Sequence, residues 1–170
     1  MQLPAVDAYT IAAFRRFYTL LPRKSDAALV VLKVHLLVEE QIRAFVDERL
    51  PNAIALAQAK ISCHTAICLA EALCDRDINP RVWEAARKLN DLRNKIAHTI
   101  EPLGMSERMN NVCLLIGAPL TELPKLGKSA QLAPLNNFIF AVAMLHGEVS
   151  MHVKQNSAEI LHLVPPESDT

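Results

Sequence analysis

The sequence is poor in glycine, with only 4 glycines among 170 residues. It contains neither the GxGxxG pattern of dinucleotide-binding folds nor the GxxxxGK[ST] pattern of P-loop proteins. Both patterns need glycines where the backbone approaches phosphate groups. The chain therefore carries no fingerprint of either class of nucleotide-binding enzyme.

Long hydrophobic runs are also missing. The longest apolar runs, 27–32 and 138–145, end at Lys33 and His146, whereas a membrane-spanning helix needs about 20 apolar residues. The N-terminal segment lacks the basic and apolar regions of a secretory signal peptide. We therefore expect a cytoplasmic protein that does not contact the membrane.

Cysteine spacing excludes two further classes. The four cysteines are Cys63, Cys68, Cys74 and Cys113. Their spacing matches neither a disulfide framework nor the CxxC pairs of zinc-binding modules. His64 and Cys68 are four residues apart, but two ligands do not make a metal site. We expect reduced, mostly buried thiols and no metal.

Net charge and aromatic content argue against broad binding of nucleic acid. The 18 basic and 18 acidic side chains cancel, and the aromatic residues are 5 Phe, 2 Tyr and 1 Trp. A general nucleic-acid coat protein would be basic, and a reader of single-stranded RNA would present aromatic rings for stacking. The charge is segregated, however: residues 76–98 carry six basic residues and three acids. A local positive surface is therefore still possible.

What the chain has is apolar residues at helical spacing, punctuated by proline. Hydrophobic residues make up 51% of the chain, and the length is that of one domain. We expect a helical-bundle domain over residues 1–155 and an acidic, flexible tail over 156–170. The predicted helices span residues 7–20, 26–49, 53–74, 81–98, 105–116 and 135–154.

These segments predict an all-α bundle of about five to six helices, because the apolar positions recur at three and four residues rather than alternating. Ser25 is the expected N-cap of the second helix, and Asn79 with Pro80 is the expected start of the fourth. His35 and Glu39 are four residues apart, and we interpret them as a contact within one helix. The link over 117–134 is either ordered or mobile.

One local pattern carries chemistry: Arg93-Asn94-Lys95-Ile96-Ala97-His98, at the end of the fourth predicted helix. Asn94 and His98 are four residues apart and share a face. An arginine always carries a charge and can donate two hydrogen bonds to phosphate. A histidine can give or take a proton at neutral pH. These residue types suit chemistry on a phosphate.

This pattern resembles the HEPN family (higher eukaryotes and prokaryotes nucleotide-binding domains). The family motif is an arginine, a polar residue directly after it, and a histidine after a gap of four to six residues. Arg93, Asn94 and His98 match all three elements, and the resemblance covers roughly residues 26–116. It implies a metal-independent endoribonuclease without a cofactor, with Arg93, Asn94 and His98 as catalytic residues. It also implies a homodimer in which two motifs line one cleft.

In such enzymes the RNA 2′-hydroxyl attacks the adjacent phosphate. We expect Lys95, Arg87 and Lys88 to bind RNA beside the motif. A toxin or defence effector with a cognate antitoxin or regulatory protein is the implied setting. One departure is Ile100: the toxin branch paired with a small nucleotidyltransferase usually has tyrosine at that position, so the chain does not fit that branch.

Alternative interpretations use the same residues. A histidine near a helix C-terminus is favourable for electrostatic reasons alone, and Arg93 can pair with Glu101. The second hypothesis is therefore a non-catalytic helical regulator or interaction module with an HEPN-like fold. A helical-bundle enzyme acting on a small molecule has no motif behind it.

Overall fold

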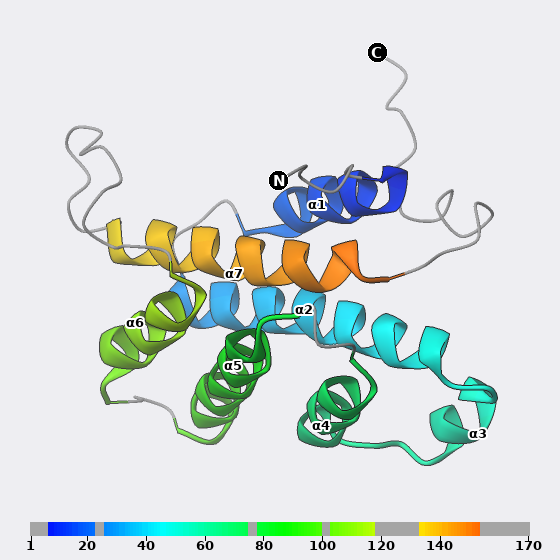
Figure 1. Ribbon diagram of the computed structural model, residues 1–170. Helices are drawn as coiled ribbons and strands as arrows, with labels where there is room; N and C mark the ends of the chain where they lie inside the picture. Colours follow the sequence, from blue (N-terminus) through cyan, green and yellow to red (C-terminus); the bar gives the residue numbers. More distant parts are fainter. Residues whose placement is uncertain (1–6, 23–25, 75–77, 100–102, 118–132, 154–170) are drawn as a thin grey trace.

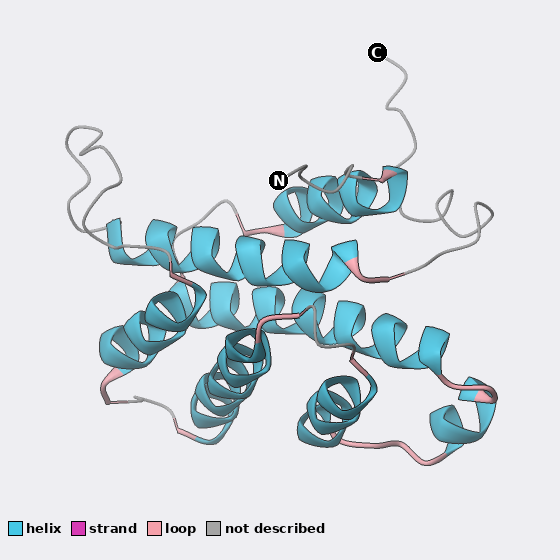
Figure 2. Ribbon diagram, in the orientation of Figure 1, coloured by secondary structure: helices cyan, strands magenta, loops and turns pink. Residues whose placement is uncertain are grey.

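A computed structural model describes residues 7–22, 26–74, 78–99, 103–117 and 133–153. Every regular element in these ranges is an α-helix (Figure 2). The helices are α1 (Ala8–Leu20), α2 (Ala27–Arg49), α3 (Ala53–Gln58), α4 (Cys63–Leu73), α5 (Pro80–His98), α6 (Met105–Ile116) and α7 (Ala133–Met151). The prediction of an all-α bundle is confirmed.

Two long helices form the middle of the bundle. α2 and α7 lie side by side (Figure 1), α1 packs mainly on α7 at one face, and α4, α5 and α6 cover the other face. Trp83, Phe17, Phe45 and Phe138 are the largest fully buried side chains. Phe45 of α2 and Trp83 of α5 meet edge to face with ring centroids 5.5 Å apart. Aromatic packing therefore joins the central pair to the layer that carries the motif.

A buried hydrogen-bond network joins α1, α2 and α7. Tyr9 Oη donates to Gln41 Oε1 at 2.7 Å. Ser150 Oγ lies 3.1 Å from the same oxygen and 2.7 Å from the backbone oxygen of His146. Because buried polar groups cost free energy unless they are paired, this network sets how the three helices fit together.

The third predicted helix, over residues 53–74, was wrong. These residues form two helices, α3 and α4, which is why the bundle has seven helices rather than six in the described residues. Lys60 adopts a left-handed backbone conformation with φ 48°, which a continuing helix does not allow. Ser62 then caps α4, its hydroxyl accepting a hydrogen bond from Thr65 N at 3.1 Å. No glycine or proline marks this break in the sequence.

Other helix ends differ by one to three residues, the largest difference being the end of α7 at Met151 instead of residue 154. α2 starts at Ala27 because Asp26 is its N-cap: the carboxylate accepts from Ala28 N and Leu29 N. Ser25, the expected cap, lies outside the described residues. α7 starts two residues earlier than predicted, since its first turn accommodates Pro134.

Some predictions cannot be followed in the structure. The tail 156–170 and most of the link 117–134 lie outside the described residues.

The expectation of mostly buried thiols was wrong for three of the four cysteines, because only Cys113 is fully buried and Cys68 is exposed. Within the described residues, no helix combines the length and apolar character needed to cross a membrane.

Candidate functional site

The motif lies at the C-terminal end of α5. Asn79 begins this helix as predicted, its side chain accepting from Arg81 N at 3.0 Å, and Pro80 occupies the first turn. Leu89 and Leu92 are buried in the core behind the motif. A helix that is capped at its start and packed into the core by leucines near its end holds its polar side chains in well-defined positions.

The three motif residues occupy the last two turns of α5. Arg93 and Asn94 are half-buried and His98 is exposed. Since an α-helix turns about 100° per residue, Arg93 and His98 leave the helix about 140° apart, whereas Asn94 and His98 are about 40° apart. Arg93 Nη1 donates to Asn94 Oδ1 at 3.0 Å. This hydrogen bond brings the guanidinium toward the face that Asn94 shares with His98.

Neither ionic residue of the motif has a carboxylate partner in the described part of the chain. The four ion pairs there involve neither Arg93 nor His98. Glu101, the acid that the sequence suggests for Arg93, lies outside the described residues. With respect to the described residues, the positive charge of Arg93 is therefore available to an external anion.

The predicted RNA-binding residues differ in their surroundings. Arg87 Nη1 pairs with Glu71 Oε2 of α4 at 2.7 Å. Lys88 and Lys95 are exposed and form no ion pair with described residues. Phosphate can approach these two lysines directly, but it must compete with Glu71 for Arg87.

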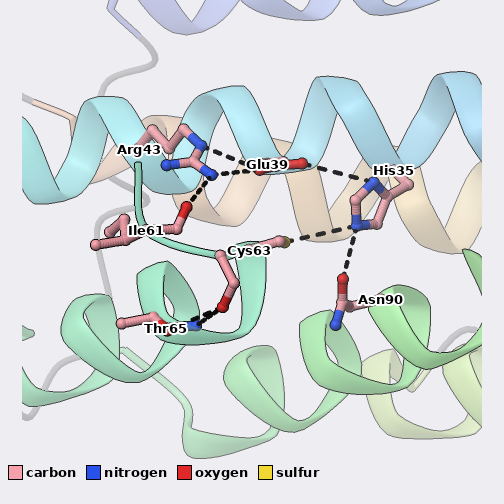
Figure 3. Close-up of polar contacts among 8 residues, drawn as sticks. His35, Glu39, Arg43, Ile61, Cys63, Thr65 and Asn90 are labelled. Atoms are coloured by element: carbon pink, nitrogen blue, oxygen red, sulfur yellow. Dashed lines mark hydrogen bonds and ion pairs between the residues drawn. The ribbon is translucent and has the colours of Figure 1, made fainter. Parts of the chain in front are cut away.

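A partly buried polar cluster lies between α2, α4 and α5 (Figure 3). His35 Nε2 lies 3.2 Å from Asn90 Oδ1 and 3.5 Å from Cys63 Sγ. His35 Nδ1 lies 3.8 Å from Glu39 Oε2. Arg43 Nη2 donates to Glu39 Oε1 at 2.6 Å and to the backbone oxygen of Ile61 at 3.1 Å. The cluster therefore connects α2 to the start of α4 and to the middle of α5.

Burial sets the protonation of this cluster. Burial lowers the pKa of His35, and the charge of Arg93 lowers it further, against the opposing hydrogen bond to Asn90 and the charge of Glu39. Burial raises the pKa of the Cys63 thiol to about 12, with a further rise from Glu39. At neutral pH the cluster therefore holds a neutral imidazole and a protonated thiol. Among the motif residues, Arg93 is the one whose charge affects the pKa values of His35 and Cys63, lowering both.

Sequence reasoning found only part of this cluster. The contact between His35 and Glu39 was predicted from their spacing, and it is present. Cys63 and Asn90 were missed, since they are 28 and 55 residues from His35 and no local pattern links them. The polar residue Asn90, one turn before Asn94 on a helix backed by leucines, was the one signal available.

The described residues also line a small cavity beside α2. Its volume is about 260 Å³, and its lining includes Arg43, Lys60, Ile61 and Ala66. None of the predicted site residues lines it. This cavity is therefore not the place of the motif.

Comparison of the chain with protein-family models, with curated proteins and with solved structures finds no match.

Proposed function

We propose that this protein is a metal-independent endoribonuclease of the HEPN type that acts as a homodimer. Arg93 and His98 are its catalytic residues, and Asn94 orients Arg93. The observation that carries this proposal is the arrangement at the end of α5. A guanidinium without a carboxylate partner among the described residues donates to Asn94, which shares a helix face with an exposed histidine one turn later.

Each residue has a role that its chemistry supports. The RNA 2′-hydroxyl attacks the adjacent phosphorus, and a histidine accepts its proton as general base. The guanidinium of Arg93 donates to phosphate oxygens, where negative charge accumulates in the transition state. A second histidine protonates the departing 5′-oxygen. The products are a 2′,3′-cyclic phosphate and a 5′-hydroxyl.

The need for two histidines is the reason for a dimer. Cleavage uses both a base and an acid, and each chain supplies one motif histidine. A two-fold interface puts the same surface of both copies together, so two exposed His98 side chains can face one cleft. Lys88 and Lys95 lie on the exposed side of α5 and can hold the RNA backbone by its phosphates.

The test is cleavage of a mixed RNA sample in the presence of EDTA. Wild type is expected to leave cyclic-phosphate ends. His98→Ala is expected to lower the rate about 10²–10⁴-fold, and Arg93→Ala about 10²–10³-fold. The mass of the complex in solution should be twice that of the chain. Wild-type rates in both variants would refute the site.

Two matched variants control for the loss of a side chain. His64→Ala removes another exposed histidine, and Arg81→Ala removes an arginine about 18 Å along the same helix, at 1.5 Å per residue. Both should cleave at the wild-type rate. If the only role of His98 were a favourable interaction with the helix dipole, His98→Ala would lower the free energy of unfolding by about 0.3–1 kcal/mol and leave the cleavage rate unchanged.

A second candidate function is a non-catalytic interaction module. It is favoured by an apolar stripe on α1, where Ile11, Phe14 and Tyr18 are 43–44% exposed. Contiguous exposed apolar residues are typical of protein contacts. This alternative predicts no cleavage of any RNA and a stable complex that Phe14→Ser disrupts.

A further inference from the structure

Three potential metal ligands from two helices converge in the cluster of Figure 3. One ligand atom each from His35, Glu39 and Cys63 lie within 4.8 Å of one another. His35 is buried, and Glu39 and Cys63 are half-buried. The ligand atoms of a tetrahedral zinc site lie about 3.3–3.8 Å apart, given zinc bonds of 2.0–2.3 Å. Closing the largest separation by about 1–1.5 Å would therefore complete the geometry.

The hydrogen bonding of His35 leaves one ring nitrogen without a donor. Nε2 lies 3.2 Å from Asn90 Oδ1, and a carbonyl oxygen can only accept, so Nε2 carries the proton. Nδ1 is then a bare lone pair. It is buried and has no hydrogen-bond partner, in a side chain that is only 4% exposed.

The group facing this lone pair is also an acceptor. Glu39 Oε2 lies 3.8 Å from His35 Nδ1, while the other carboxylate oxygen, Oε1, is held by Arg43. Two acceptors face each other here without a proton between them, and His35 Nδ1 is the one that is buried without a partner. A cation placed between them would bind the lone pair of Nδ1 and the carboxylate together.

We propose that His35, Glu39 and Cys63 bind one divalent cation of the zinc class, with Asn90 fixing the tautomer of the histidine. Imidazole, thiolate and carboxylate together are a ligand set that suits zinc. The amide of Asn90 acts on the far ring nitrogen, as partners of metal-binding histidines do. Cys63 Sγ lies 3.5 Å from Nε2, so on binding its side chain turns toward the Nδ1 side of the ring. There the sulfur gives up its proton to solvent and forms a bond to the metal.

This site would join α2 to the first turn of α4 and would be a structural feature of the fold. Cys63 directly follows the break between α3 and α4, whose loop is held by Arg43 through Ile61. The metal would fix this junction. The inference does not depend on the proposed ribonuclease function, and its test uses no RNA.

The test is titration of the reduced full-length chain with Co²⁺, which takes zinc sites and absorbs strongly in the near ultraviolet when a thiolate binds it. Wild type is expected to bind one equivalent with this thiolate absorption, and added Zn²⁺ is expected to abolish it. Cys63→Ala should lose the absorption. Asn90→Ala should weaken Co²⁺ binding about 10–100-fold.

Cys68→Ala is the matched control. Cys68 lies on the same helix and its sulfur is 3.7 Å from His64 Nε2, so it forms a second cysteine–histidine pair at the surface. This variant should bind Co²⁺ like wild type. Absorption that is lost in Cys68→Ala and kept in Cys63→Ala would overturn the assignment.

Absence of thiolate absorption in folded wild-type protein at one equivalent of Co²⁺ would also overturn it. Glu39→Gln guards against a folding defect in Cys63→Ala, because it keeps the shape of the side chain. It is expected to weaken Co²⁺ binding at least 10-fold while its circular dichroism spectrum matches that of wild type. Unchanged affinity in this variant would remove Glu39 from the site.

Discussion

At the scale of single residues, the most informative contact is the one between Arg93 and Asn94. The neutral Oδ1 of Asn94 accepts from Arg93 Nη1 at 3.0 Å. A neutral acceptor orients the guanidinium and leaves its charge uncompensated. The choice of asparagine at this position therefore affects how strongly Arg93 attracts phosphate.

Replacing this asparagine by aspartate tests the point. In Asn94→Asp the carboxylate would pair with Arg93 and compete with RNA phosphate. A partly exposed ion pair is worth at most about 1 kcal/mol, so kcat/KM for RNA should fall up to about 5-fold. Added salt should shrink the difference, because it screens the new pair. Steady-state cleavage assays at two salt concentrations measure both effects, and a kcat/KM above that of wild type would contradict this role.

At the scale of helices, the start of α5 was predictable, whereas the N-cap of α2 and the break between α3 and α4 were not. Asn79 and Pro80 predict the start of α5, because the preferences of asparagine for the N-cap and of proline for the first turn act locally. The break at Lys60 depends on tertiary contacts: Arg43 of α2 reaches across to the Ile61 oxygen. A chain segment rich in alanine and leucine favours a continuous helix unless such a contact competes.

Substitutions at Lys60 test how much backbone strain at this break lowers the free energy of unfolding. Its φ of 48° strains any side chain that has a Cβ atom. Lys60→Gly should raise the free energy of unfolding by about 1 kcal/mol. Lys60→Ala keeps the Cβ atom and should give no comparable gain. Urea denaturation of both variants measures the difference, and equal stability of the two would contradict the argument.

At the scale of the whole molecule, the fold class followed from the sequence, and the polar clusters did not. Helical periodicity is a property of each segment, so the all-α bundle was predictable. The hydrogen bonds of His35 to Asn90 and of Gln41 to Ser150 span 55 and 109 residues. A single sequence does not specify such pairs until the helices are placed. The placement of Arg93, Asn94 and His98 at the end of one helix was predictable, because all three lie within one periodic segment.

Global stability should depend on pH through His146. Burial in the bundle lowers its pKa from 6.5 to about 4, and the charge of Arg16 adds to this. Between those values the unfolded chain binds a proton that the folded chain does not. The free energy of unfolding should therefore fall as the pH drops from about 6.5 to 4, by about 3 kcal/mol in total from this residue.

Urea unfolding at several pH values measures this dependence. His146→Gln is the comparison, since glutamine is polar and does not titrate. Its stability should depend less steeply on pH over the same interval. Some slope should remain, because burial also lowers the pKa of His35. Equal slopes in the variant and the wild type would assign the effect to other groups.

The position of α7 has a consequence for the order of synthesis. This helix is the last one in the described chain, yet α1, α2, α5 and α6 all pack on it. About 110 residues separate the end of α1 at Leu20 from the start of α7 at Ala133. At a translation rate of about 5–20 residues per second, roughly 6–22 seconds pass before α1 meets its main partner. Throughout that interval, the faces of α1 and α2 that pack on α7 lack this partner on the nascent chain, and chaperones can bind them.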